Sequence, residues 1–373
     1  MRIGIMLRHF RQHGGGIRVY TENLLREMLS NTTSHEFILF YNDPELIGTY
    51  GEHHYVREIA LRVPSVLLWD QVAVPRAAKR EKVDLIFNLK YSIPLATKCC
   101  TVWVCHGLDW YVMPQWSRWM DRLNHRYLIP RYAQKADMII AVSDTARKHV
   151  IEYLGVDEGR LRTVYLGVDD AFRRPIPQEK LEEIRRTYRL PDRFFLYCGQ
   201  IYPPKNFSRL LRAYARVGPG LGIALVVAGE HRWLSEQELG LVDELNLSSW
   251  IVQLKWVDRV ILPAFYILAA ALLLPSLYES FGLPILEAMA CGCPTVTANR
   301  YGTREIAGPA AVLVDPENVD DIVQGIYRVA TDPALRQQLV LAGRERVQGF
   351  SWKKCAQETL QALEAAWLNR GNL

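Results

Sequence analysis

Two glutamates, Glu279 and Glu287, lie on either side of a Gly-Leu-Pro sequence in the stretch PSLYESFGLPILEAMACGCP, residues 275–294. The apolar run before this stretch is typical of a buried strand, and the residues from Pro284 onward are typical of a helix. Gly282 and Pro284 suit the place where such a helix begins. The pattern therefore predicts a strand, a loop that carries Glu279, and a helix with Glu287 in its first turn.

The start of this predicted helix has groups that suit a phosphate. Its unpaired backbone N–H groups, around Phe281, Gly282 and Leu283, would face an anion that the helix dipole favours. A carboxylate in the first turn can accept hydrogen bonds from two vicinal hydroxyls, such as those of a ribose. We therefore predict a cradle for a nucleoside diphosphate. The plainer alternative gives Glu287 only a dipole contribution of about 0.3–1 kcal/mol and leaves Glu279 in solvent.

Apolar runs typical of strands alternate with helical patterns along the whole chain. The strands and helices that they predict must hold this loop in position. The first series contains RIGIML, EFILFY, VDLIFN, TVWVCH, MIIAVS and RTVYLG, with amphipathic helices predicted over YTENLLREML and DTARKHVIEYL. A second series follows the charged, proline-rich residues 169–193 and contains FFLYCGQ, IALVVAGE, IVQLKW, ALLLPS, CPTVTA and AAVLVD. Strands that alternate with helices form parallel sheets, whose ligands lie beyond the carboxyl ends of the strands.

We therefore predict an α/β protein with two Rossmann-like, doubly wound domains that face a central cleft. The first domain would cover residues 1–170 and the second residues 171–350, followed by a C-terminal helix, 351–373, that returns to the first domain. The length of 373 residues and the hydrophobic content of 49% are enough for two such cores.

The charge and the cysteines exclude several classes of protein. A net charge of +5 is too small to indicate nucleic-acid binding, although it favours an anionic ligand or lipid surface. The seven cysteines contain no CxxC pair and lie in apolar runs, which is typical of reduced thiols in a cytosolic protein. The apolar stretch VILPAFYILAAALLLPSLY contains two prolines and is too interrupted for a membrane-spanning helix.

The stretch 275–294 resembles, nearly residue for residue, the E-x(7)-E signature of the retaining glycosyltransferases of family 4, which have the GT-B fold. Other segments are similar to this family in the same order and cover nearly the whole chain. These segments are HGGGIRVYTENLLREM, CHGLDW, IIAVSDTARKHV, VYLGVDDAFRR, YCGQIYPPKNFSRLLRAY and YGTREIAGPAAVLVDPEN. The resemblance implies transfer of a hexose from a nucleotide diphosphate sugar.

The resemblance also implies which residues bind the donor phosphates. Lys205 and Asn206 follow the strand FFLYC, and Lys205 would stabilise the departing diphosphate together with the N–H groups of Gly15 and Gly16. No D-x-D metal motif is present, so we expect no metal and no cofactor. The family pattern has an arginine where this chain has Gln200, whose amide donates a hydrogen bond but carries no charge.

Further contacts follow from the same resemblance. His106, at the end of the strand TVWVC, would bond to the donor sugar, and Asp109 would orient the acceptor. Val257 and Asp258 match the segment that holds the nucleobase, where a carboxylate suits the donor edge of guanine and so favours a GDP-sugar over a UDP-sugar. Glu279 would contact the hexose. With His106 and Lys205 it completes the predicted catalytic set.

Other functions stay open at this point. A nucleotide-sugar epimerase or a glycogen-synthase-like enzyme can share the fold. A site without activity is a further alternative, because Gln200 lacks the usual charge. An NAD-dependent dehydrogenase would use Gly14, Gly16 and Asp43, but Val19 stands where the helix-packing glycine is required.

The acceptor is a glycan, a lipid-linked sugar or a small molecule, and the sequence patterns do not favour one of these three classes. The segment WSRWMDRLNHRYLIPRY places arginines four residues apart, with aromatic residues between them, at positions 118, 122 and 126. This pattern fits either an interfacial helix on anionic lipid or an ordinary surface helix. We expect a cytoplasmic protein, either free or attached peripherally to the inner face of the membrane.

Overall fold

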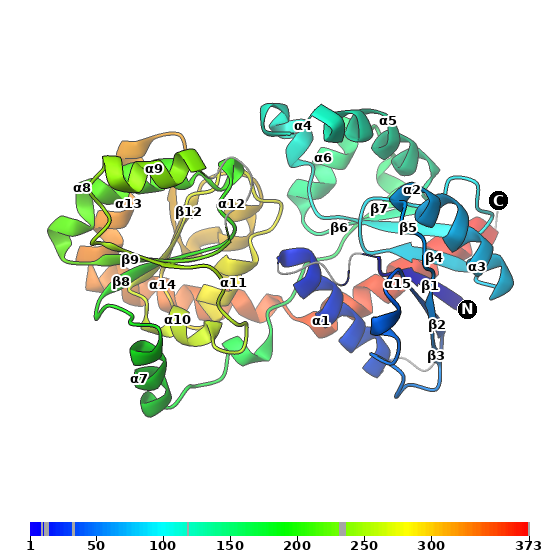
Figure 1. Cartoon of the computed structure of the whole chain (residues 1–373), viewed down its shortest axis with the longest axis horizontal. Helices are drawn as coiled ribbons and strands as arrows, with labels where there is room; N and C mark the ends of the chain where they lie inside the picture. Colours follow the sequence, from blue (N-terminus) through cyan, green and yellow to red (C-terminus); the bar gives the residue numbers. More distant parts are fainter. Residues whose placement is uncertain (9, 11–14, 32–33, 118, 231–235, 372–373) are drawn as a thin grey trace. The chain divides into compact units, whose positions relative to one another are not determined.

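The computed structural model describes the chain except for residues 9, 11–14, 32–33, 118, 231–235 and 372–373. The chain forms two compact units (Figure 1). Unit 1 combines Met1–Gly167 with Trp352–Leu373, and unit 2 is Val168–Ser351. Each unit is built around one parallel sheet.

The sheet of unit 1 has seven strands in the order β3-β2-β1-β4-β5-β6-β7 among the described residues. Each pairing between neighbours is parallel. The strands are β1 (Arg2–Met6), β2 (Glu36–Tyr41), β3 (Val56–Ala60), β4 (Leu85–Asn88), β5 (Cys100–Cys105), β6 (Met138–Ala141) and β7 (Leu161–Thr163). The central strands are buried on both faces, which explains why their sequences are continuous apolar runs.

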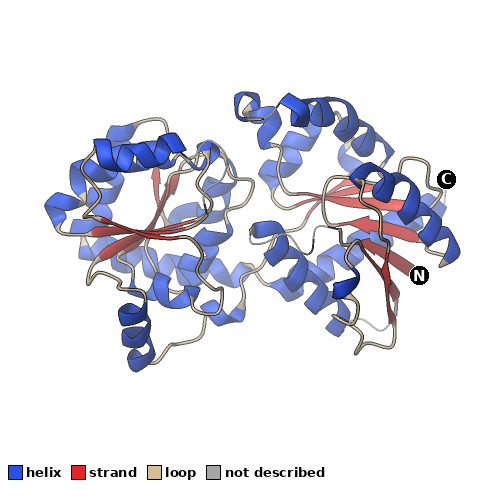
Figure 2. Ribbon diagram, in the orientation of Figure 1, coloured by secondary structure: helices blue, strands red, loops and turns tan. Residues whose placement is uncertain are grey.

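Helices cover both faces of this sheet (Figure 2). They are α1 (Gly16–Asn31), α2 (Val66–Leu68), α3 (Val74–Arg80), α4 (Asp109–Val112), α5 (Trp119–Lys135), α6 (Asp144–Leu154) and α15 (Trp352–Gly371), with a π-helical turn at Trp69–Ala73. The last helix, α15, packs against α1, and its Arg370 forms an ion pair with Asp137 at 2.7 Å. The end of the chain therefore completes unit 1 rather than unit 2.

The sheet of unit 2 has six strands, again parallel, in the order β10-β9-β8-β11-β12-β13 within the described part of the chain. Its strands are β8 (Phe194–Cys198), β9 (Ala224–Ala228), β10 (Ile251–Leu254), β11 (Ala271–Leu274), β12 (Thr295–Ala298) and β13 (Val312–Val314). Its helices are α7 (Gln178–Thr187), α8 (Phe207–Val217), α9 (Glu236–Glu244), α10 (Leu262–Leu268), α11 (Leu283–Ala290), α12 (Tyr301–Ala307), α13 (Val319–Thr331) and α14 (Pro333–Arg346).

The two parallel sheets confirm the predicted α/β class, with local differences. The predicted strand RTVYLG ends at Thr163, and β3 was not predicted. The sequence of β3, VREIA, contains two charged residues because it forms an edge strand that stays only partly buried. The apolar pattern that marks a buried strand is therefore absent there.

Candidate active site

Lys205 and Glu279 meet beyond the carboxyl ends of two neighbouring strands of unit 2. Lys205 ends a short 3-10 turn, Pro203–Lys205, after β8, and Glu279 lies in the loop between β11 and α11. The Lys205 Nζ donates to Glu279 Oε1, which also accepts from Ser276 Oγ at 3.1 Å. Burial lowers the pKa of Lys205, but the neighbouring Glu279 carboxylate outweighs it and the pKa is raised. Lys205 is therefore a fixed positive charge at neutral pH.

Backbone hydrogen bonds hold the Glu279 loop in place. The Leu277 N–H donates to the Pro204 carbonyl at 2.9 Å, and the Gly302 N–H donates to the Glu279 carbonyl at 2.9 Å. A Cβ atom at Gly302 would lie 2.3 Å from the Ser280 carbonyl oxygen, so a larger residue would push this loop away. The position of the Glu279 carboxylate thus depends on a close approach that glycine permits.

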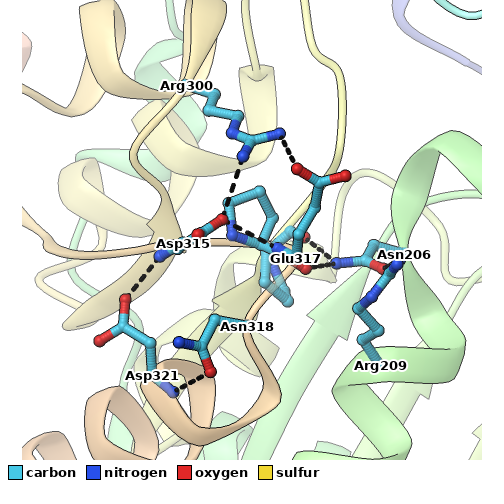
Figure 3. Close-up of polar contacts among 9 residues, drawn as sticks. Asn206, Arg209, Arg300, Asp315, Glu317, Asn318 and Asp321 are labelled. Carbon is cyan, nitrogen blue, oxygen red and sulfur yellow. Dashed lines mark hydrogen bonds and ion pairs between the residues drawn. The ribbon is translucent and has the colours of Figure 1, made fainter.

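Asn206 joins the loops after β8, β11 and β13 (Figure 3). Its buried amide donates to the Pro275 carbonyl at 2.8 Å and to the Pro316 carbonyl at 2.7 Å, and its Oδ1 accepts from Arg209 at 3.1 Å. Its backbone φ is +60°, a left-handed conformation that asparagine tolerates better than most residues. Both amide protons are engaged within the protein, so the side chain positions the loop that carries Lys205.

The loop after β13 has its own anchors, which Figure 3 also shows. Arg300 forms ion pairs with Asp315 at 3.2 Å and with Glu317 at 2.6 Å. The Asp315 N–H donates to Asp321 Oδ2 at 2.6 Å, at the start of α13. These contacts keep the carbonyl of Pro316 where the Asn206 amide reaches it.

Glu287 does not lie in the first turn of its helix, which corrects the sequence-based prediction. Helix α11 begins at Leu283 with Gly282 as its N-cap at φ +99°, so Glu287 lies one turn further in. Its side chain is 4% exposed. Its carboxylate accepts from Arg259 Nη1 at 2.7 Å and from the Tyr266 hydroxyl at 3.0 Å. Glu287 is therefore a buried, paired carboxylate, and the plainer alternative of a simple dipole contact does not describe it.

Arg259 and Tyr266 are site residues that the sequence patterns did not indicate. The Arg259 guanidinium lies over the ring of Phe172, with 5.0 Å between its Cζ atom and the ring centroid. Burial raises the pKa of Tyr266 well above its usual value, so the hydroxyl keeps its proton and donates to Glu287. The one available signal was that Arg259 directly follows the predicted base-binding residues, Val257 and Asp258.

Cys198, at the end of β8, connects these two ion pairs. The pKa of its thiol is raised to about 12, mainly by burial and also by the Glu287 carboxylate, while the charges of Arg259 and Lys205 lower it. All three charged groups therefore act on one point beside the sheet. Unit 2 brings Lys205, Glu279, Arg259 and Glu287 into one polar cluster.

The other predicted donor residues of unit 2 surround this cluster in different ways. Phe281 is buried and packs edge-to-face on Phe350, with 6.1 Å between the ring centroids, so only its backbone can serve a ligand. Leu283 is buried as the first residue of α11, and Val257 is buried near Arg259 in the sequence. Asp258 is exposed, and one of its oxygens accepts from the Val260 N–H at 2.9 Å.

Gln200 lies immediately after the left-handed turn at Gly199. The backbone carbonyl of Gln200 accepts from the Tyr197 hydroxyl at 3.0 Å, and Gln200 is partly buried. A Cβ atom at Gly229 would lie 1.8 Å from the Gly199 carbonyl oxygen, so the loops after β8 and β9 touch through glycine backbones. The position of Gln200 is therefore fixed by its main chain.

Unit 1 places His106 at the carboxyl end of β5. Its Nε2 lies 2.8 Å from the Leu89 carbonyl, and Tyr20 of α1 packs edge-on against the imidazole, with 4.8 Å between the ring centroids. A carbonyl only accepts, so Nε2 carries the proton. Burial lowers the pKa of His106 to about 4. The imidazole is therefore neutral at pH 7, and its Nδ1 acts as an acceptor.

The remaining predicted residues of unit 1 lie near helix starts. Gly15 is exposed with φ +105°, Gly16 is the first residue of α1, and Asp109 is the first residue of α4. Gly14, which the dehydrogenase alternative requires, lies outside the described residues. These positions belong to unit 1, whereas the charged cluster belongs to unit 2.

Three broader features of the described residues bear on the chemistry. Among them, no group of three or more histidine, cysteine, aspartate or glutamate side chains could hold a metal ion. No helix in the described part of the chain has the length and apolar character needed to cross a bilayer. All seven cysteines are free thiols.

Comparisons with known proteins agree with this architecture. The family model "Glycosyl transferases group 1" matches residues 181–346, and the model "Glycosyltransferase Family 4" matches residues 14–172. The sucrose-phosphate synthase structure from Thermosynechococcus elongatus superimposes with a TM-score of 0.80 at 22% identity, covering 99% of this chain and 100% of that one. The fold and the matched models thus define a glycosyltransferase with two parallel-sheet domains.

Curated relatives place the chain within one family. It is 30% identical to the O-antigen chain mannosyltransferase B of Escherichia coli, over 69% of this chain and 68% of the relative. It is also 30% identical to the MMP alpha-(1->4)-mannosyltransferase of Mycolicibacterium hassiacum, over 98% of both chains. Some other matched mannosyltransferases are longer, and the chain spans about a third of their length. The chain belongs to glycosyltransferase family 4, with the GT-B fold, and is a transferase enzyme.

The Asn206 tie gives a stability prediction. We expect Asn206→Ala to lower the free energy of unfolding by about 2–4 kcal/mol, because two buried carbonyls lose their donor and alanine is strained at a positive φ. Urea unfolding measures this change. Asn206→Gly is the matched control, since it loses the same hydrogen bonds without the backbone strain and should recover part of the loss. If Asn206→Ala unfolds with the same free energy as the wild type, the hydrogen bonds of the Asn206 amide contribute nothing to stability.

Proposed function

We propose that this glycosyltransferase moves a hexose, with mannose favoured over glucose, from a nucleotide diphosphate sugar to an acceptor hydroxyl with retention of configuration. The observation that carries the proposal is the pairing of Lys205 with Glu279, and of Arg259 with Glu287, beside the start of α11. Such a cluster offers cations for phosphates and carboxylates for sugar hydroxyls. The names of the mannosyltransferase relatives support mannose as the sugar.

The proposed reaction breaks the bond between the sugar C1 and the diphosphate oxygen and forms a bond from C1 to the acceptor oxygen on the same face. The leaving phosphate takes the proton of the acceptor hydroxyl. Lys205 and the backbone N–H groups at the start of α11 stabilise the charge that develops on the leaving group. No metal is needed in this scheme, because fixed cations and backbone dipoles carry out the same electrostatic task.

Glu279 and His106 have the roles of sugar-contacting groups in this proposal. The Glu279 carboxylate retains oxygen lone pairs for a hexose hydroxyl beyond those used by Lys205 and Ser276. His106 is neutral and offers Nδ1 as an acceptor, so it binds a hydroxyl and does not act as a charged group. Asp109, at the start of α4, is proposed to orient the acceptor.

The base of the donor is proposed to be guanine. Asp258 is exposed, and the bond to Val260 uses one of its two oxygens, which leaves the other free for the adjacent N–H donors of guanine. Uracil lacks this pair of neighbouring donors. A GDP-sugar is therefore favoured over a UDP-sugar.

A donor screen tests the proposed function. Labelled GDP- and UDP-sugars are incubated with soluble glycans and with lipid-linked sugars, and the products are analysed for linkage and anomeric configuration. We expect transfer from a GDP-hexose with retention, and slow release of free hexose when no acceptor is present. Formation of an epimerised donor, or of a long glucan from a single donor, would support the epimerase or glycogen-synthase-like alternative instead.

Treatment with EDTA tests the absence of a metal requirement. We expect transfer to continue at the untreated rate after EDTA and desalting, because Lys205 and the α11 start supply the electrostatic stabilisation. The rate is compared with that of samples supplied with Mg²⁺ or Mn²⁺. A strict need for either ion contradicts the metal-free part of the proposal but leaves the transferase activity in place.

The two glutamates should differ in their kinetic effects. Glu279→Gln should lower kcat more than it raises the KM for the donor, because this carboxylate contacts the reacting sugar. Glu287→Gln should raise the donor KM by the equivalent of about 1.5–3 kcal/mol, through loss of a charged acceptor for the ribose. It should also lower the melting temperature, since it leaves Arg259 unpaired.

Glu345→Gln is the matched control, because Glu345 is exposed on α14 within the same unit. Its kinetic constants and melting temperature should equal those of the wild type. If both site variants melt early but keep normal kcat and KM once folded, the two carboxylates are structural and the site is assigned wrongly.

We also propose a peripheral contact between unit 1 and anionic lipid. Val66, Leu67 and Leu68 of the short helix α2 are 52%, 52% and 54% exposed, an uncommon run of three solvent-facing apolar residues. On α5, Leu123 and Tyr127 are exposed beside exposed arginines at positions 122, 126 and 131. Exposed apolar and basic side chains together suit a bilayer surface with negative headgroups.

These two segments are connected through the structure of unit 1. Burial and the nearby Asp70 carboxylate, which belongs to the π-helical turn that directly follows α2, raise the pKa of Tyr132 on α5. Arg126 lies over the ring of Tyr127, with 5.9 Å between its Cζ atom and the ring centroid. Arg118, part of the predicted basic pattern, lies outside the described residues. The apolar and basic groups named here therefore belong to neighbouring elements of one domain.

Co-sedimentation with vesicles tests the lipid contact. We expect binding to vesicles that contain phosphatidylglycerol, loss of that binding at high salt, and little binding to phosphatidylcholine alone. The double substitution Leu67→Ser and Leu68→Ser should weaken binding severalfold without changing the donor kinetics in solution. Leu341→Ser, an exposed apolar residue of unit 2, is the matched control. Unchanged sedimentation of the double variant contradicts this surface.

A further inference from the structure

Arg259 has no role in the predicted site, yet it is the partner of one of the two signature glutamates. We propose that Arg259 is a donor-binding residue, whose guanidinium exchanges the Glu287 carboxylate for the donor diphosphate and so frees Glu287 for the ribose. The inference rests on the proposed function, because it assumes a nucleoside diphosphate in unit 2. It is carried by the contacts of Arg259, Glu287 and Phe172.

The charge balance of the cluster is the first argument. Lys205 with Glu279, and Arg259 with Glu287, give two cations and two carboxylates with no net charge. A diphosphate brings at least two negative charges to the same place. Burying them beside two carboxylates is unfavourable unless the cations turn to the phosphates. An exchange of partners gives every charged group a hydrogen-bond partner, since the cations then face the phosphates and the sugar and ribose hydroxyls can donate to the carboxylates.

The incomplete hydrogen bonding of Arg259 is the second argument. A guanidinium has five N–H donors, and the described contacts engage Nη1 with Glu287 at 2.7 Å. The Nε atom is buried without a partner among the described residues. The side chain is nevertheless 29% exposed, so part of it can be reached from solvent. A purely structural arginine would be expected to saturate its buried donor.

The support under the guanidinium is the third argument. Phe172 is buried and fixed, and the Arg259 Cζ atom lies 5.0 Å from its ring centroid. A cation that stacks on an aromatic face keeps its edge available for hydrogen bonds in the plane of the group. Arg259 can therefore change its hydrogen-bond partner while it stays on the ring. Tyr266 meanwhile continues to donate to Glu287 and holds that carboxylate in place.

The position of the guanidinium relative to Lys205 fits a shared ligand. Both cations pair with carboxylates of one continuous segment, Lys205 with Glu279 in the loop before α11 and Arg259 with Glu287 on α11 itself. Lys205 is the proposed phosphate cation, and Gln200, which follows the turn at Gly199, carries no charge. The structure thus provides Arg259 as a second cation on the same side of the cluster.

Binding of GDP and of guanosine to Arg259→Met separates the possibilities. The wild type is measured first by calorimetry with GDP, UDP and guanosine. We expect Arg259→Met to weaken GDP binding about 10- to 100-fold, which is the range for loss of a charged hydrogen bond. Guanosine should bind as in the wild type or more tightly, because it has no phosphate and Glu287 is already free. Arg259→Lys should restore part of the GDP affinity.

The outcomes that would overturn the inference are distinct from those that affect the proposed function. If Arg259→Met weakens GDP and guanosine by the same factor, Arg259 only positions Glu287. If neither affinity changes, it has no part in donor binding. If the wild type binds neither GDP nor UDP, the proposed function itself fails.

Two further variants guard against a folding artefact. The double variant Arg259→Met with Glu287→Gln removes both charges, so no buried carboxylate is left unpaired. It should still bind GDP at least as weakly as Arg259→Met, and wild-type GDP affinity in it would contradict the inference. Arg216→Gln removes an arginine from an exposed ion pair with Asp320 in the same unit and should bind both probes normally.

Discussion

The donor side of this enzyme depends on the pairing of charges that are largely removed from water. Lys205 and Arg259 stay charged in a mostly buried position because Glu279 and Glu287 face them at hydrogen-bond distance. A charged side chain without a partner in such a place would cost several kcal/mol of lost solvation, or it would become neutral by gaining or losing a proton. Pairing therefore allows unit 2 to keep two cations and two carboxylates charged beyond the ends of its strands.

This pairing requires loops with a fixed conformation, and these loops extend from the strands of the parallel sheet. The two partners of each ion pair come from segments that follow different strands, so these segments must be fixed to each other as well as to the sheet. The amide of Asn206 joins three of these loops, and the Gly302 N–H holds the Glu279 carbonyl. In both contacts the acceptor is a main-chain carbonyl. A substitution of another side chain does not remove such an acceptor. The charges are therefore positioned by backbone contacts.

Unit 1 contributes a different kind of site, in which burial controls the protonation of one imidazole. His106 is enclosed by Tyr20 and by the Leu89 carbonyl, and its low pKa keeps it neutral. A neutral histidine with Nε2 protonated is a directional hydrogen-bond acceptor at Nδ1 and carries no charge. Helix α15 supports this region from the far end of the chain, because Trp352 packs near the Tyr20 ring at 6.1 Å between centroids.

The amino-acid sequence by itself determined the α/β class and the loop that carries Glu279. It could do so because buried parallel strands are continuous apolar runs and because a glycine and a proline mark where α11 begins. It also placed Lys205 in the loop that follows β8. These features are local, and each can be read within a short segment of the chain.

Only the tertiary structure decided the partners of the two glutamates. Glu287 lies 28 residues from Arg259, and Glu279 lies 74 residues from Lys205, so neither pair follows from local spacing. The sequence placed Glu287 in the first turn of its helix and did not indicate its bonds to Arg259 and Tyr266. The sequence also gave no sign that the two Asn206 amide protons bond to carbonyls 69 and 110 residues away. Long-range packing chooses such partners, since burial of a polar group is favourable only where a distant segment happens to supply its hydrogen bond.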